Sequence, residues 1–216
     1  MSKFADIYGH EQIKEHLQNA IRLNKVSHAY IFNGPMGSGK KMTAGIFAET
    51  LQCERHGQEP CGTCHSCIQS ESGNQPDIIW VHHEKPGSIG VDDVREQVIG
   101  DMQIKPYSSR YKIYIIDEAE KLTQQAQNAL LKTIEEPPAY GIIILLTTNA
   151  DTFLQTILSR CVRLDFRPLR DTLVTQYLQE KYDLTDYECR FATAFAQGKI
   201  GRAAVSYTHL RAHETK

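Results

Sequence analysis

The chain has 216 residues, a hydrophobic fraction of 41%, a charged fraction of 23% and a formal net charge of -2, the balance of an ordinary globular protein. No apolar run approaches the roughly 18–20 residues that a membrane span needs, and the first residues, MSKFADIYGHEQIKEH, lack the apolar stretch of a secretory signal. Basic residues are scattered, which argues against tight binding to the DNA backbone by this chain alone. We expect a cytoplasmic protein without membrane association.

Short apolar runs alternate with helical periodicities along the chain, as in a parallel sheet covered by helices. The predicted strands are residues 28–32, 77–81, 111–116, 142–148 and 162–166, and the predicted helices are residues 13–21, 44–51, 91–102 and 124–135. The last of these helices ends before Pro137 because proline cannot continue a helix.

After Arg167 and Pro168 only helical patterns remain, so we predict a domain boundary there. The predicted units are residues 1–167, a small helical unit at residues 168–206, and a tail at residues 207–216. The tail, YTHLRAHETK, fits no periodicity and resembles a translated cloning read-through; a short natural tail is the alternative.

A glycine-rich loop, GPMGSGK, follows the first predicted strand and opens a helix, the setting of a phosphate-binding P-loop. Glycines let successive backbone N–H groups face one concavity, and the helix N-terminus adds its positive dipole. The predicted nucleotide-binding residues of this segment are Gly34, Gly37, Ser38, Gly39, Lys40 and Lys41.

Lys41 departs from the pattern of a hydrolytic P-loop. That position normally carries Ser or Thr, whose hydroxyl ligates the Mg²⁺ that bridges the phosphates. A charged lysine has no lone pair and repels a divalent cation. We therefore expect ATP or ADP to bind through the backbone amides and Lys40, and we doubt that Mg²⁺-dependent hydrolysis is efficient.

Polar residues end two of the apolar strands. Asp117 and Glu118 follow Tyr114–Ile116 as in a Walker B element, where the first carboxylate holds Mg²⁺ through water and the second orients the attacking water. A pair of acids capping the next helix is the alternative. Asn149 ends the fourth strand, where it could bond a phosphate or the water.

Four cysteines stand within fifteen residues in the order C-x7-C-x2-C-x2-C: Cys53, Cys61, Cys64 and Cys67. A reducing cytosol disfavours disulfides, and this spacing suits a tetrahedral Zn²⁺. Four protein ligands leave no open position, so the zinc would be structural. His65 in place of one thiolate is a variant, and Cys161 and Cys189 receive no metal role.

Taken together, GPMGSGK, the cysteine insertion, YIIDEAEKLT, NALLKTIEEPP and LSRC resemble the bacterial DNA polymerase III clamp loader, in both its γ/τ and its δ′ subunits. The resemblance covers about residues 4–205 and implies an AAA+ P-loop fold. That fold has a five-stranded parallel sheet flanked by helices, with a zinc-binding insertion at residues 53–67 and a helical lid. The C-terminal collar domain of the family is not in this chain, which we interpret as a fragment.

The resemblance also implies a role in DNA replication. Lys41 favours a δ′-type subunit with a weak or inactive ATPase, and the γ/τ-type motor is the alternative. The implied partners are γ/τ and δ subunits, the sliding clamp and, mainly through the complex, primed DNA. Arg160 of Ser159-Arg160-Cys161 matches the arginine finger that acts in trans on a neighbouring site. Arg202 matches the second sensor of the family, which contacts the nucleotide. Glu118 would be a vestigial catalytic residue.

A zinc-dependent nucleic-acid-binding module is a rival function from another class.

Overall fold

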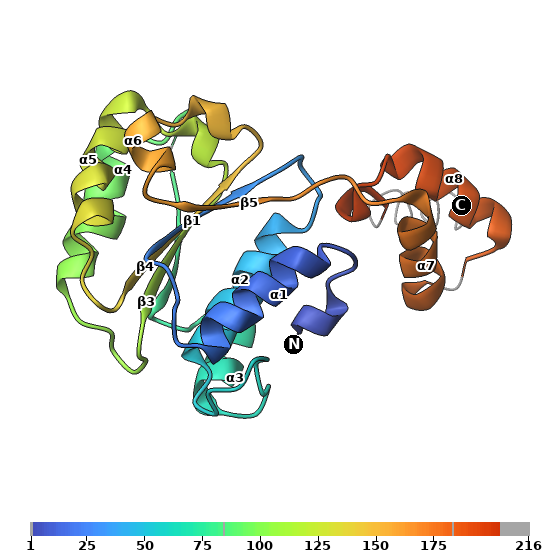
Figure 1. Ribbon diagram of the computed structural model, residues 1–216, viewed down its shortest axis with the longest axis horizontal. Coiled ribbons are helices and arrows are strands. Elements are labelled where there is room, and N and C mark those ends of the chain that lie inside the picture. The colour runs from blue at the N-terminus through green and yellow to red at the C-terminus, as the bar shows by residue number, and fades with distance from the viewer. Residues whose placement is uncertain (1, 84, 183, 204–216) are drawn as a thin grey trace.

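The computed structural model describes residues 2–83, 85–182 and 184–203. Among these residues, five parallel strands form one sheet in the order β2-β3-β4-β1-β5 (Figure 1). The strands are β1 (Ala29–Asn33), β2 (Ile78–Val81), β3 (Lys112–Ile116), β4 (Gly141–Thr147) and β5 (Val162–Asp165). The α-helices are α1 (Glu11–Arg22), α2 (Lys40–Gln52), α3 (His65–Glu71), α4 (Val91–Val94), α5 (Gln124–Glu135), α6 (Gln155–Leu158), α7 (Asp171–Lys181) and α8 (Asp186–Ala196).

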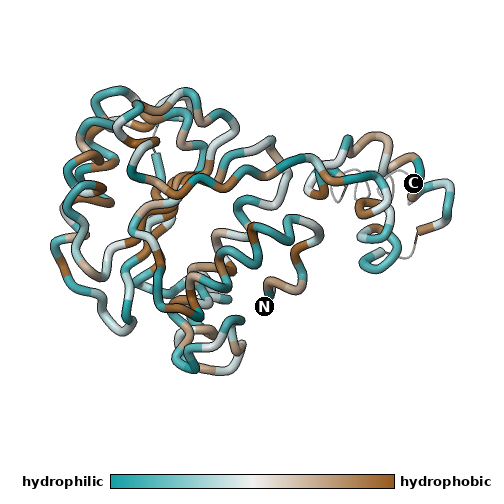
Figure 2. Tube along the Cα trace, in the orientation of Figure 1, coloured by the Kyte–Doolittle hydropathy of each residue, from teal (hydrophilic) through white to brown (hydrophobic). Residues whose placement is uncertain are grey.

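The strand sequences explain the layers, because successive side chains of a strand point to opposite faces. Tyr30 and Ile113 pack with α1 and α2 on one face. Ile31 and Tyr114 pack with α4, α5 and α6 on the other. Figure 2 shows the hydrophobic residues gathered along the central strands. The predicted α/β architecture with a five-stranded parallel sheet is therefore confirmed.

Three elements of the structure differ from the prediction. The cysteine-containing insertion, for which no helix was predicted, leads into a helix, α3, whose N-cap Cys64 accepts a hydrogen bond from the backbone of Cys67. The helix predicted over residues 91–102 starts as α4, continues as a π-helix over Arg95–Gly100 and ends in a 3-10 turn. The short helix α6 has no counterpart among the predicted elements.

Beyond β5, the helices α7 and α8 pack on each other around their own apolar cluster, which includes Val174, Leu178 and Cys189. Figure 1 shows them to one side of the sheet. The predicted tail at residues 207–216 lies outside the described residues. Within the described chain, no helix combines the length and apolar character needed to span a bilayer.

Candidate functional site

The P-loop connects β1 to the first turn of α2. Gly39 caps α2 with a φ of 93°, a left-handed conformation that L side chains rarely adopt. The Ser38 and Gly39 backbone leads directly into the helix N-terminus, where unpaired N–H groups favour anions. The loop therefore has the backbone geometry of a phosphate cradle.

Lys40 folds back over this loop. Its Nζ donates to the carbonyl oxygens of Gly34 and Pro35, the latter at 2.8 Å. Burial lowers the pKa of Lys40, while Glu120 and Asp117 oppose that effect electrostatically. The lysine is thus a buried cation held at the loop by backbone carbonyls.

Lys41 reaches across to the end of β3. Its Nζ lies 3.2 Å from Asp117 Oδ2, with side-chain exposures of 69% and 41%. The same Nζ lies 5.2 Å from the ring centroid of Trp80 on β2. An ammonium group therefore pairs with the carboxylate that was predicted to hold Mg²⁺, and Trp80 is a contact that the sequence did not indicate.

Glu118 has a left-handed backbone, with a φ of 50°. Its Oε2 lies 2.6 Å from Lys121 Nζ and 3.7 Å from His83 Nε2. These contacts hold the carboxylate beside Asp117 at the mouth of the site. Neither His83 nor Lys121 was a predicted site residue.

Glu120 joins the ends of β3 and β4. It accepts hydrogen bonds from the backbone N–H and the hydroxyl of Thr148, at 3.2 and 2.7 Å. Burial raises its pKa, but the bonds from Thr148 and Thr147 outweigh burial and the net shift is downward. Asn149 is exposed, and its Oδ1 accepts from the Asp151 backbone at 3.0 Å. The proposed phosphate contact of Asn149 remains a prediction.

The helical part of the chain after β5, residues 168–182 and 184–203, which we call the lid, contacts the P-loop directly. The Gly201 backbone N–H donates to Gly37 O at 2.9 Å, and a Cβ on Gly201 would lie 2.9 Å from Gly37 Cα. Arg202 follows, with its guanidinium 5.8 Å from the Phe195 ring centroid. The close approach thus requires glycine at 201 and brings Arg202 next to the loop.

These elements enclose a cleft between the P-loop, the acidic strand end and the lid. Its lining includes Gly37, Gly39, Lys40, Lys41, Asp117, Glu118, Glu120, Thr148, Tyr177 and Gly201. An adjoining hollow is lined by Asp6, Ile7, Tyr8, Ser38, Met42 and Lys181, among others. Most of the predicted nucleotide-binding residues therefore meet in one place.

Arg160 lies elsewhere, between α6 and β5, and does not line this cleft within the described chain. Its Nη2 lies 3.0 Å from Glu135 Oε1, and its Nη1 donates to Thr156 O at 3.0 Å. The side chain is 40% exposed. Arg160 is therefore held at the surface by Glu135, away from its own P-loop.

The four predicted cysteines come together. The Sγ atoms of Cys53, Cys61, Cys64 and Cys67 all lie within 4.8 Å of one another, near the roughly 3.8 Å separation that a tetrahedral ion with Zn–S bonds of about 2.3 Å imposes. The backbone N–H of Thr63 stabilises the Cys61 thiolate and lowers its pKa to about 5. The cluster can hold a metal ion such as zinc, and His65 is exposed and outside it.

The other two cysteines lie outside the cluster. Cys189 is buried in the core of the lid. Cys161 is half-buried against the main core, and burial raises its pKa to about 12.

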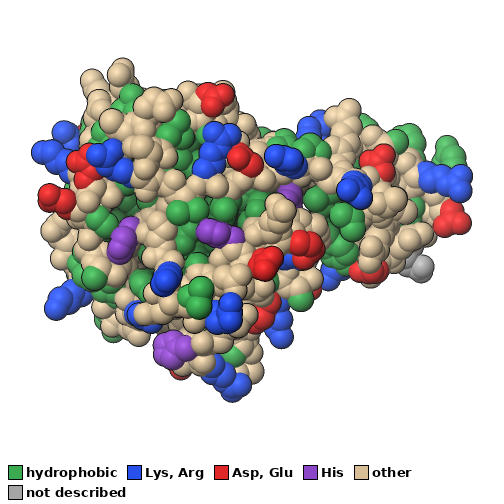
Figure 3. All heavy atoms as spheres, in the orientation of Figure 1, with side chains coloured by type: hydrophobic (Ala, Val, Ile, Leu, Met, Phe, Trp, Pro, Cys, Tyr) green, Lys and Arg blue, Asp and Glu red, His purple; other side chains and the backbone are tan. Residues whose placement is uncertain are grey.

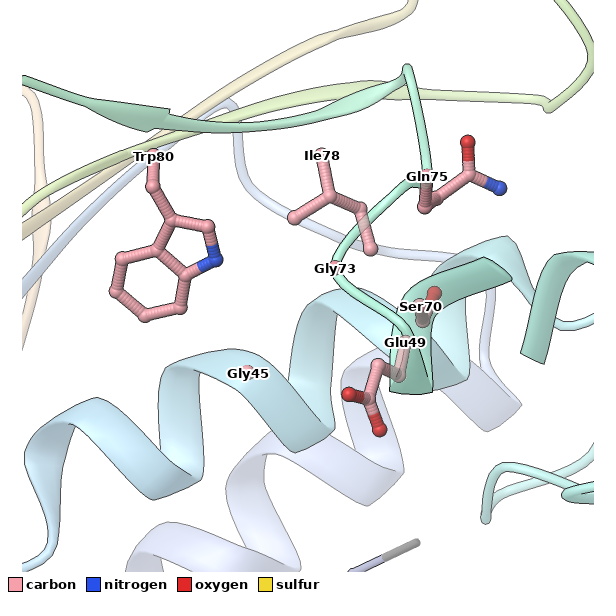
Figure 4. Close-up of a pocket in the computed structure, with 7 residues that line it drawn as sticks. All are labelled: Gly45, Glu49, Ser70, Gly73, Gln75, Ile78 and Trp80. Atoms are coloured by element: carbon pink, nitrogen blue, oxygen red, sulfur yellow. The ribbon is translucent and has the colours of Figure 1, made fainter. Parts of the chain in front are cut away.

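A second, smaller cavity lies between β2, α2 and α3 (Figure 4). It is lined by Gly45, Glu49, Ser70, Gly73, Gln75, Ile78 and Trp80. Figure 4 shows the side chains of Ile78 and Trp80 pointing from β2 towards α2. Burial raises the pKa of Glu49. The cavity thus lies beside the tryptophan that Lys41 contacts.

Comparisons with known proteins agree with this geometry. The family described as DNA polymerase III, delta subunit, matches residues 9–170. The tau/gamma subunit of DNA polymerase III from Haemophilus influenzae is 39% identical over 212 residues, covering 95% of this chain and 30% of its own. The tau subunit from Bacillus subtilis is 40% identical over 182 residues, covering 84% of this chain and 32% of its own. The chain thus spans about a third of the length of these curated relatives.

Solved structures show the same fold. A DNA polymerase III gamma subunit-related protein from Thermotoga maritima superimposes with a TM-score of 0.56 at 23% identity, covering 83% of this chain and 57% of that one. The Holliday junction branch migration motor RuvB from Thermotoga maritima gives 0.59 at 17% identity, covering 91% and 59%. These likenesses confirm the predicted AAA+ P-loop fold. Because the match to the family described as DNA polymerase III, delta subunit, spans residues 9–170, the chain belongs to the DNA polymerase III clamp-loader family.

Proposed function

We propose that this chain is a clamp-loader subunit that helps load a sliding clamp onto primed DNA during replication. The observation that carries the proposal is a P-loop cleft closed by a lid in a chain of this family. Other clamp-loader subunits and the clamp would be its partners, and primed DNA would be bound mainly through the complex. The subunit would act in the cytoplasm.

Nucleotide is the proposed ligand of the cleft. The backbone amides that open α2 would hold phosphate oxygens, and Lys40 would exchange its loop carbonyls for them. Arg202 would contribute from the lid. The Mg²⁺ usually bound with ATP supplies charge neutralisation at the phosphates, whereas here Lys41 pairs with Asp117.

The subunit type is supported unequally by the comparisons. The curated relatives named above are tau or gamma subunits, so they favour the γ/τ-type alternative over the δ′ type that the sequence led us to expect. On that basis we propose a γ/τ-type subunit as the first candidate. Such a subunit would bind ATP in this cleft and hydrolyse it within the assembly.

A δ′-type subunit is the second candidate, and the Lys41–Asp117 pair favours it. A chain without the hydroxyl ligand, and with an ammonium group 3.2 Å from the carboxylate predicted to hold Mg²⁺, would be a poor catalyst on its own. It would act instead through Arg160, which would reach the nucleotide of a neighbouring subunit.

Steady-state ATPase measurements with Mg²⁺ separate the two candidates. The unmodified chain is assayed alone and with partner subunits and primed DNA, beside a Lys40→Ala variant. Turnover that DNA stimulates and Lys40→Ala abolishes supports the γ/τ type. ATP binding without turnover, in a chain that still stimulates its partners, supports the δ′ type. Failure to bind nucleotide or partners would refute the proposed function.

The rival nucleic-acid-binding module has less support. Figure 3 shows Lys and Arg side chains interspersed with acidic ones on the face in view, without a continuous basic patch. A salt-dependent titration of the isolated chain with duplex DNA tests this rival, because phosphate contacts produce a steep loss of affinity with salt. We expect weak binding.

A further inference from the structure

Glu59 joins the four-cysteine module (residues 53–67) to the start of the chain. Its Oε2 accepts a hydrogen bond from the Phe4 backbone N–H at 2.8 Å, and its Oε1 accepts one from Gln18 Nε2 at 3.0 Å. Both bonds are partly buried, and bonds to a carboxylate are stronger than neutral ones. Glu59 thus uses one oxygen on the N-terminal segment and the other on α1, both distant from it in sequence.

The N-terminal segment, residues 4–8, forms part of the wall of the hollow that adjoins the cleft. Figure 1 shows it beside α1, on the side that faces the lid helices, and three of its residues line the hollow next to Ser38. Tyr8 donates a hydrogen bond to Glu180 of α7, and Asp6 Oδ1 lies 3.7 Å from Lys181 Nζ. The segment therefore spans from the P-loop to the lid.

The position of Glu59 depends on the sulfur cluster. Glu59 stands two residues before Cys61, whose backbone N–H donates to Cys53 Sγ at 3.4 Å. The intervening residues, 54–60, form no helix or strand, so convergence of the cysteines closes this loop. A bound metal would fix that closure, because metal ligation orders the segment that supplies the ligands.

We propose that the metal-loaded four-cysteine module uses Glu59 to hold residues 4–8 as a wall of the hollow that adjoins the cleft and shares Gly39 and Tyr177 with it, and so couples metal binding to nucleotide binding. The coupling rests on the proposed function in taking a nucleotide as the cleft ligand. Glu59 is a positioning residue, since it acts through Phe4 and Gln18. Coupling between two sites is reciprocal, so nucleotide must strengthen metal binding by the same factor.

Hydrogen–deuterium exchange tests the mechanical part without any nucleotide. In zinc-loaded protein, Glu59→Ala should accelerate exchange across residues 4–8 while zinc content stays at one per chain. Chelator-stripped unmodified protein should show the same acceleration. Glu59→Gln, which keeps an acceptor for the Phe4 N–H, should fall between. Glu15→Ala, which removes an exposed carboxylate from α1, is the matched control and should leave exchange unchanged.

Calorimetric titration with ADP tests the coupling. Loss of the charged hydrogen bond to Phe4 is only partly transmitted to the cleft and should weaken ADP binding about threefold to tenfold in Glu59→Ala. Competition with a zinc chelator should show ADP tightening zinc binding in the unmodified chain by the factor by which zinc tightens ADP binding.

Two results would overturn the inference: unchanged exchange at residues 4–8 after Glu59→Ala or zinc removal, or ADP affinity that is equal in all variants. If the unmodified chain binds no ADP, the proposed function fails instead, and the exchange experiment still decides whether Glu59 holds the segment. Should Glu59→Ala misfold, Glu59→Gln and zinc removal give the same readout.

Discussion

Replacing Lys41 by Thr tests why the P-loop is expected to hydrolyse ATP poorly. The substitution removes the ammonium group that lies 3.2 Å from Asp117 Oδ2 and supplies the hydroxyl that ligates Mg²⁺ in hydrolytic P-loops. We expect Mg²⁺ to strengthen ATP binding in Lys41→Thr, and turnover to rise if the remaining groups are in place.

The structure limits the cost in stability. Both partners are substantially exposed, so the ion pair contributes at most about 1 kcal/mol. The contact of Lys41 with Trp80 adds about 0.5–1 kcal/mol at an exposed site. The variant should therefore unfold no more than about 4–8 °C below the unmodified chain, at about 2–4 °C per kcal/mol for this size.

The gain in Mg²⁺ binding is similar in size to that cost. Two unit charges about 4 Å apart interact by about 1 kcal/mol in water and about 4 kcal/mol near a protein surface. For an exposed lysine we take about 1–2 kcal/mol of repulsion relieved, which is roughly tenfold in affinity. The hydroxyl should add to this. Lys41→Val has the shape of Thr without the hydroxyl, so the difference between the two variants isolates the ligand.

The assay is titration with ATP at increasing Mg²⁺, in buffer free of chelators that would strip the cysteine cluster, followed by single-turnover hydrolysis. Equal behaviour of Lys41→Thr and Lys41→Val would show that the hydroxyl is not what the site lacks. If both variants bind ATP with the Mg²⁺ dependence of the unmodified chain, Lys41 does not block the metal and our reasoning is wrong.

Three further predictions concern the other sites. Purified protein should contain one zinc per chain, and Cys61→Ser should lose most of it, as elemental analysis can measure; full retention would contradict a four-thiolate site. Gly201→Ala should open the lid and weaken ADP binding several-fold, because its Cβ would lie 2.9 Å from Gly37 Cα; unchanged affinity would mean that this contact is not needed. Arg160→Ala should cost less than about 1 kcal/mol of unfolding free energy, since its partner Glu135 is also exposed. The variant should nevertheless slow clamp loading and DNA-stimulated ATPase in a reconstituted loader. An unaffected rate would refute the action of Arg160 on a neighbouring subunit.

The sheet could be predicted from the sequence because its central strands are apolar on both faces. Every residue of Lys112–Ile116 and Gly141–Thr147 is buried, so each strand stands out as a continuous run. The cysteine cluster could be predicted for a related reason: its ligands lie close together in sequence. In both cases the determining pattern is local.

Contacts between distant polar residues could not be predicted. Asp77 is 1% exposed, and its carboxylate accepts hydrogen bonds from the backbone N–H groups of Tyr107, Ser108 and Ser109, which the strand pattern at residues 77–81 does not indicate. The hydrogen bond from the Phe4 backbone N–H to Glu59 is a second case. Each depends on tertiary packing that brings an acid to unpaired donors, and composition carries no signal for it.

Lys41 and Arg160 lie in different parts of the chain, and this separation bears on the subunit type. Lys41 lies in the chain's own cleft, so its substitution affects only what this chain binds. Arg160 lies outside that cleft and is paired to Glu135, so its side chain can be removed by mutation without disturbing the P-loop. A chain can therefore lose hydrolysis at its own site and still supply an arginine to a neighbour. For that reason the sequence relationship to tau and gamma subunits does not by itself require this chain to be a motor. ATP turnover by Lys41→Thr measures hydrolysis at the chain's own site, and clamp loading by Arg160→Ala independently measures the action on a neighbour.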